Sequence, residues 1–130
     1  MRLEEAVYAY LISEPAVHAK IAERLYPLLL PQKCILPAVA YTLVSVDRTP
    51  ALQKDTGYTR AVLQYSCHAK SYREAVMVAH LLKNALQDFS GNMNGLMIGA
   101  VLVVSEMADY EPKTDTYLAH IEFEFHFNEN

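Results

Sequence analysis

The sequence has few of the residues that build catalytic centres, with four glycines, two cysteines and no tryptophan among 130 residues. The glycines form no phosphate-binding loop, because none is followed by Lys and then Ser or Thr. Cys34 and Cys67 are 33 positions apart, a spacing typical of neither a zinc knuckle nor a disulfide framework. We therefore expect reduced thiols, no metal and no cofactor.

Long apolar runs are also missing. The longest, Gly95 to Val104, has about half the length that a bilayer-spanning helix needs, so we interpret it as a nearly fully buried strand and expect no membrane association. Glu4 and Glu5 stand where a signal peptide carries basic residues, which predicts a cytosolic protein. With 52% hydrophobic and 20% charged residues, the chain is typical of a single domain spanning residues 1–130.

Charge is unevenly distributed along the chain. Residues 1–83 hold ten basic and seven acidic side chains, a net charge of +3, whereas residues 84–130 hold one basic and eight acidic side chains, a net charge of −7. The basic residues form no cluster, so the sequence predicts no specific nucleic-acid recognition. The asymmetry is either scatter over solvated faces or a source of two unlike surfaces.

Hydrophobic periodicity predicts an α+β fold. We expect N-terminal helices within 2–26, an irregular proline-rich linker over 27–37, strands at about 38–47 and 59–69, a helix over 71–90, and strands at about 96–110 and 116–127. The predicted fold is an antiparallel sheet of about four strands, with a long helix packed on one face and one or two short N-terminal helices. Residues 48–57 have no apolar period and are expected to form an exposed contact loop.

Two predicted elements have clear local signals. Ser71 and Glu74 form a capping box that starts a helix, and Gly91 stands where a left-handed cap would end it. Over residues 117–127 apolar and polar side chains alternate, which predicts a strand with one buried face and one wet face. The wet face carries His120, Glu122, Glu124 and His126.

These polar residues are weak candidates for chemistry. His120 and His126 would be about 20 Å apart along a strand, too far to share a metal ion. Glu122 and Glu124 could imitate the carboxylate pair of a glycosidase, but a sugar site normally also uses aromatic platforms. We interpret the face as solvated, or as covered by another subunit.

Cys67 is an equally poor candidate for a nucleophile. It lies on the apolar face of its predicted strand, where a thiol stays protonated. His68 follows it directly and therefore points to the opposite face. The sequence thus predicts no catalytic residue.

A series of short phrases runs along the chain. In order, they are Arg24-Leu25-Tyr26-Pro27, Leu30-Pro31-Gln32, Leu36-Pro37-Ala38-Val39 with Tyr41 and Val44-Ser45, Gln64-Tyr65-Ser66-Cys67 with Ala69, Ser71-Tyr72-Arg73-Glu74-Ala75, and Asp109-Tyr110-Glu111-Pro112 with Thr114 and Tyr117. Their joint order and spacing resemble the tail completion, or tail terminator, proteins of long-tailed bacteriophages and prophages. The resemblance covers nearly the whole chain.

The resemblance implies an α+β subunit of a ring, typically hexameric, that caps the tail tube and joins it to the head. The partners would be further copies of the chain, the tail tube protein and the head-tail connector protein. The protein would be structural, would assemble in the host cytoplasm and would reside in the virion tail. An isolated subunit could remain monomeric until its loops contact the tube.

A closed ring needs two complementary patches on every subunit. We expect the basic residues Arg48, Lys54 and Arg60 to meet the acidic residues Glu106, Asp109 and Glu111 of a neighbour. A further hypothesis turns Glu122 and Glu124 toward the channel, where like charge would keep passing DNA from sticking. The alternatives are an oligomeric adaptor, which would bind an unrelated host protein, and a small enzyme, which would retain a metal or ligand.

Overall fold

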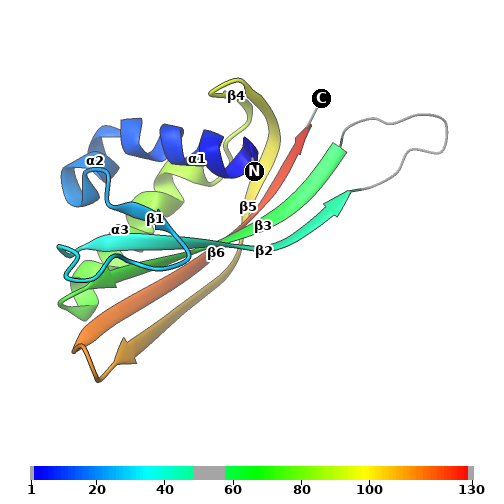
Figure 1. Cartoon of the computed structure of the whole chain (residues 1–130). Coiled ribbons are helices and arrows are strands. Elements are labelled where there is room, and N and C mark those ends of the chain that lie inside the picture. Colours follow the sequence, from blue (N-terminus) through cyan, green and yellow to red (C-terminus); the bar gives the residue numbers. More distant parts are fainter. Residues whose placement is uncertain (1, 49–57, 129–130) are drawn as a thin grey trace.

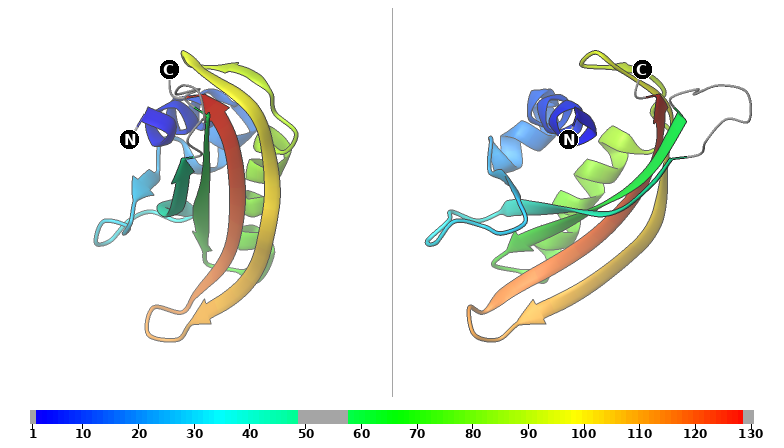
Figure 2. Two further views of the ribbon diagram at one scale, coloured as in Figure 1. Left: turned by 90° about the vertical axis from the view of Figure 1, so that its right-hand side faces the viewer. Right: turned by 45° about the vertical axis from the view of Figure 1, so that its right-hand side comes forward.

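A computed structural model describes residues 2–48 and 58–128 of the chain (Figure 1). Along these residues the elements follow in the order α1 (Arg2–Ser13), α2 (Pro15–Ile21), β1 (Leu25–Pro27), β2 (Ala38–Arg48), β3 (Tyr58–Ala69), α3 (Tyr72–Leu86), β4 (Gly91–Met93), β5 (Leu96–Glu111) and β6 (Thr116–Asn128). The helices lie on the inner side of a curved sheet (Figure 2).

The described strands form one mixed sheet with the order β1-β2-β3-β6-β5-β4. Strand β1 runs parallel to β2, and the other neighbours are antiparallel. The predicted antiparallel sheet of about four strands with a long helix is therefore wrong, because the sheet has six strands and α3 has only 15 residues. Strands β1 and β4 have three residues each, too few to show an alternating pattern in the sequence.

The N-terminal helices end earlier than expected. Helix α2 stops at Ile21, and residues 25–27, predicted to close the helical region and open the linker, instead pair with residues 39–41 of β2. Pro27 is tolerated in β1 because this strand is at the edge of the sheet, where one side of the backbone has no ladder to complete.

Three register shifts shape the sheet. One separates Leu43 from Ser45 in β2, and β5 has two more, at Ile98/Ala100 and Val103/Ser105. A bulge bends its strand and increases the local twist. The long strands consequently curl into a half-barrel around the helices (Figure 2).

Helix α3 begins as the capping box predicts. The Ser71 Oγ accepts a hydrogen bond from the Glu74 backbone N–H at 3.1 Å, and the helix packs its buried stripe against β3 and β6. Its end differs from the prediction: the helix stops at Leu86 and Asp88 adopts a φ of 64°. Gly91, expected as the cap, starts β4 with a φ of 115°.

Strand β6 alternates as its sequence predicts, with one face in the core. The buried residues are Ala119, Ile121, Phe123, Phe125 and Phe127. The prediction that Gly95 to Val104 is nearly fully buried is wrong, because Met97, Leu102 and Val104 are 54%, 45% and 48% exposed. Strand β4 pairs only with residues 96–98 of β5, so the rest of β5 is an edge within the described part of the chain.

Candidate assembly surfaces

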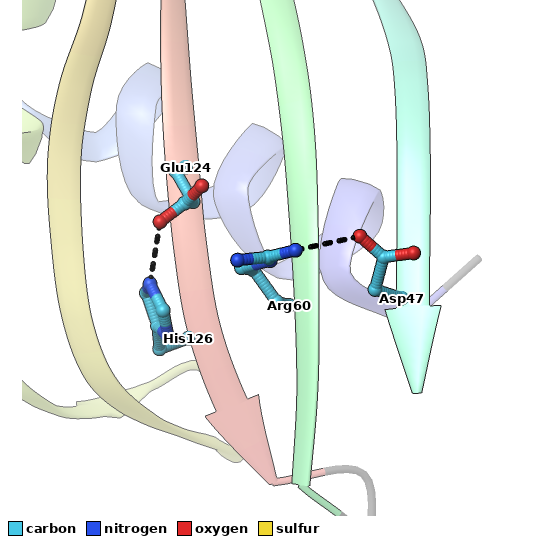
Figure 3. A network of polar contacts seen from close by, with 4 residues as sticks. All are labelled: Asp47, Arg60, Glu124 and His126. Carbon is cyan, nitrogen blue, oxygen red and sulfur yellow. Dashed lines mark hydrogen bonds and ion pairs between the residues drawn. The ribbon is translucent and has the colours of Figure 1, made fainter. Parts of the chain in front are cut away.

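The outer face of the sheet, away from the helices, carries the polar side chains of β6. Three polar contacts lie on this face: Ser66 Oγ with His120 Nδ1 at 2.8 Å, His126 Nε2 with a Glu124 carboxylate oxygen at 2.7 Å, and an Arg60 guanidinium N–H donated to the Asp47 carboxylate at 2.9 Å. Figure 3 shows the last two side by side. The face is thus a set of mutually paired polar groups on β2, β3 and β6.

These contacts do not assemble catalytic chemistry. Burial raises the pKa of the Cys67 thiol, which keeps it protonated, and the strand register places His68 on the opposite face. In residues 2–48 and 58–128, no cluster of three His, Cys, Asp or Glu side chains could hold a metal ion. No helix in the same residues is long and apolar enough to cross a bilayer.

The charged residues expected to join neighbours lie toward opposite ends of the sheet. Arg48 ends β2 and Arg60 lies near the start of β3, whereas the acidic residues lie on the last third of β5 (Figure 1). Arg60 is in register with His126 and so with Ala100. The six residues from there to Glu106 span about 20 Å, so the structure does not bring the two sets together within one subunit.

Charged residues of both sets already have oppositely charged partners inside the chain. Arg60 pairs with Asp47, and Glu106 pairs with Lys83 at 3.3 Å. Lys54, the third basic residue of the predicted contact, falls outside the described residues.

Sequence reasoning missed the most exposed apolar side chains. Leu28, Leu29 and Ile35 are 67%, 81% and 71% exposed, more than any other large apolar side chain in the described residues. They belong to segment 28–37, which was expected to be only a linker. The available signal was the triplet Leu28-Leu29-Leu30 between two prolines, because a solvated connection is normally polar.

A second apolar surface lies at the opposite edge of the sheet. Strand β5 exposes Met97, Leu102 and Met107 on the outer face of the sheet, in register with Asn128, Glu124 and His120, and it also exposes Val104 and Tyr110. On the inner side of the sheet α3 exposes Tyr72, Val76 and Met77. A hollow of about 270 Å³ lies between α3, the last third of β5 and the start of β6, and we call it the β5–α3 groove. It is lined by Tyr72, Val76, Ala79, His80, Glu106, Met107, Ala108, Ala119 and His120. Apolar surface of this extent is typical of a protein interaction site.

Comparisons with known proteins identify a family and a similar fold. The sequence matches the family described as tail completion protein gp17 over residues 5–127. The fold matches 24 chains of solved structures, including one from the virion of a native gene transfer agent (GTA) particle. That chain is 17% identical, with a TM-score of 0.74 over 97% of this chain and 94% of its own. No curated protein sequence gives a significant match.

The family match extends from α1 into the last strand, so it covers nearly the entire fold. It confirms the resemblance that the sequence phrases indicated. A tail completion role is structural, and it accounts for a molecule whose large exposed apolar residues lie mainly in segment 28–37, on α3 and on β5. The chain therefore belongs to the tail completion protein gp17 family, and its role is that of a structural tail completion protein.

Proposed function

We propose that the protein forms a closed ring, a hexamer, which ends the tail tube and joins it to the head. The observation that carries this proposal is the presence of two unlike apolar surfaces at opposite edges of one sheet. Contact between unlike surfaces is heterologous, and a heterologous contact generates a ring when the rotation between subunits closes.

The ring would need two partners besides its own copies, the tail tube protein below it and the head-tail connector protein above it. Assembly would take place in the host cytoplasm, and the finished ring would be part of the virion. The similar fold of a chain in a gene transfer agent virion supports this location. The proposal requires no catalysis and no cofactor.

The proposal is tested by mixing the purified protein with tail tubes assembled from the same genome and imaging the tube ends by negative-stain electron microscopy. Ring-shaped caps that stop tube growth are expected. Bare ends and continued growth would contradict the terminator role and favour the adaptor, which would then be sought through a host partner.

A charge contact is the first candidate for the joint between subunits. We propose that Arg48, Lys54 and Arg60 approach Glu106, Asp109 and Glu111 of the neighbour, which requires Arg48, Arg60 and Glu106 to exchange their present partners. Arg48→Glu with Lys54→Glu should then weaken capping, whereas Lys70→Glu, at an exposed site outside both sets, should not. Unchanged capping by the double variant would remove the charge contact from the proposal.

The polar outer face is the candidate for the channel lining. Glu122 and Glu124 are half-buried there, and Glu124 already contacts His126. If they face the channel, Glu122→Lys with Glu124→Lys should slow DNA passage, because a basic lining attracts the phosphate backbone. Normal DNA delivery by capped tails that carry this variant would exclude the channel position.

A further inference from the structure

We propose that segment 28–37 of one subunit inserts into the β5–α3 groove of the next subunit, and that this apolar contact joins the ring. The inference rests on the ring proposed above and names its contact. Each chain would then donate one segment and receive another.

The segment is held in a projecting conformation. Arg24 closes its base, since its guanidinium Nε donates to the Pro37 carbonyl at 3.0 Å, and the Leu28 backbone N–H donates to the Tyr41 carbonyl at 2.8 Å. Leu28 has a φ of 67°, an uncommon and costly conformation for a residue with a Cβ, of a kind that clusters at functional sites. These contacts fix the base of a segment whose Leu29 and Ile35 side chains remain in solvent.

The groove has the size and lining for such side chains. Tyr72, Val76 and His80 follow one another at four-residue spacing along α3 and form one wall. The small side chains of Ala79 and Ala119 leave the hollow open. A cavity of roughly 150 Å³ holds a benzene molecule, so about 270 Å³ has room for two aliphatic side chains.

The segment cannot fill the groove of its own subunit. It connects β1 and β2 at one edge of the sheet, while the groove lies against β5 near the other edge. Four strand spacings separate β1 from β5, about 19 Å across the sheet. In the left view of Figure 2 the segment projects from one side, and β5 and α3 lie at the other. The occupant must therefore come from another molecule.

Charge complementarity favours a second copy of this chain. Lys33 is the only charged residue in segment 28–37. Residues 105–116, beside the groove, carry four acidic side chains and one basic side chain. Glu106 is paired with Lys83 of α3, so the remaining side chains of this stretch carry a net charge of −2. An apolar segment with one cation thus faces an apolar groove with an acidic rim, an arrangement that steers association and fixes register.

Cysteine cross-linking tests the contact directly, because the segment carries the native Cys34. In Ala108→Cys the new thiol would lie at the groove, because Ala108 is exposed, lines the hollow and shares the α3-facing side of the sheet with Ala119. Oxidation of the concentrated protein, or of capped tubes, should give a ladder of disulfide-linked multimers. Two controls should give no ladder: Ala108→Cys with Cys34→Ser, and Val44→Cys, which places a thiol at an exposed site outside both surfaces.

Paired variants test the head-to-tail direction. Leu29→Glu with Ile35→Glu disables the segment, and Val76→Glu with Ala108→Glu disables the groove. Each variant alone should lose capping by about 100-fold or more, because two charges would enter an apolar contact. Mixed together, they retain one intact contact and should stop at the heterodimer, as measured by native mass spectrometry. Val44→Glu should cap like the wild type.

The outcomes separate this contact from the ring itself. A ladder that depends on Cys34, with or without capping of tubes, supports the inserted segment. The inserted segment would be contradicted if capping were normal, no ladder formed and Leu29→Glu/Ile35→Glu still capped tubes. The proposed ring would not be affected by that result. Capping abolished by Arg48→Glu but not by the segment variants would overturn the inserted segment in favour of the charge contact. If the isolated variants unfold, the cross-linking result decides.

Discussion

Strands β5 and β6 are neighbours and both are rich in apolar residues, yet their surroundings differ. Strand β6 lies between β3 and β5, and every second side chain from Ala119 to Phe127 is buried. Strand β5 has a strand on its outer side only at residues 96–98, and residues 104–111 are all exposed. The same type of sequence thus builds core in a central strand and interaction surface at an edge.

The difference between β6 and β5 distinguishes residues that stabilise the subunit from residues that take part in assembly. The phenylalanines of β6 contribute to folding because the helices cover them. In β5 only Leu96, Ile98 and Val101 are buried in the core. Its exposed apolar residues contribute little to the isolated fold, and an exposed apolar edge is an aggregation hazard unless a partner covers it. We expect substitutions of the buried residues of β6 to change stability and substitutions of the exposed residues of β5 to change assembly.

The largest expected effect concerns the core of β6. Phe123 is fully buried, and its ring contacts Tyr65 at a centroid distance of 5.9 Å and Phe125 at 6.3 Å. Phe123→Ala should lower the free energy of unfolding by about 3–5 kcal/mol through lost transfer energy and a cavity. Leu102→Ala in β5 should cost less than about 1 kcal/mol. Urea denaturation measures both, and equal losses would break the comparison.

Hydrogen exchange should show the same contrast at the backbone. In β6 the amides are bonded to β3 or β5, so their opening free energy should approach that of global unfolding. In β5 the amides of residues 104–111 that point away from β6 should open at almost no cost. Mass spectrometry of peptides from the two strands measures this, and slow exchange throughout β5 in the isolated subunit would contradict an open edge.

Much of this fold is local enough to be visible in the sequence. The alternation of β6, the opposite faces of Cys67 and His68, and the Ser71 cap each depend on residues within a few positions of one another. The short strands are different. Strand β1 exists because residues 25–27 meet residues 39–41, and three residues have no period of their own. Hydrophobic periodicity therefore could not predict the six-stranded sheet.

The assembly surfaces were hidden for a related reason. Prolines indicated irregular backbone over 27–37, of which Pro27 belongs to β1, but backbone irregularity says nothing about where Leu29 or Ile35 points. The apolar run of β5 was interpreted as core, but Met97 and Leu102 lie on the outer face of the sheet, away from the helices, and the sequence alone does not reveal that this face is uncovered. The sequence shows which residues are charged but not which of them form ion pairs, because the partner of Arg60 is Asp47 on another strand. The family resemblance, not the residue pattern, supplied the function.

A moderate effect is expected at the helix that covers β6. Ser71→Ala removes the side-chain acceptor for the Glu74 amide and should cost about 1 kcal/mol of stability. Because α3 packs chiefly on β3 and β6, exchange should rise in β6 near Ala119 more than in the already open part of β5. Ser71→Thr, which keeps a hydroxyl, is the matched control and should lose less. Equal losses for Ala and Thr would show that the cap contributes nothing.

The smallest effect is a pH dependence on the outer face. Burial, with a further contribution from the nearby His120, lowers the pKa of His68 below its ordinary value of 6.5; Ser66 already contacts the His120 ring. The unfolded chain then binds the proton more readily than the folded one. Stability contributed by neutral His68 is complete above about pH 6.5 and is lost as the pH falls toward the lowered pKa.

His68→Gln should therefore flatten the decline in unfolding free energy between about pH 7 and pH 5. Because His68 is on β3 and His120 on β6, the effect belongs to the packed centre of the sheet, and variants of the β5 edge such as Leu102→Ala should not alter it. If Leu102→Ala changed the pH profile as strongly as His68→Gln, the pH dependence would not be specific to His68 and the prediction would be wrong.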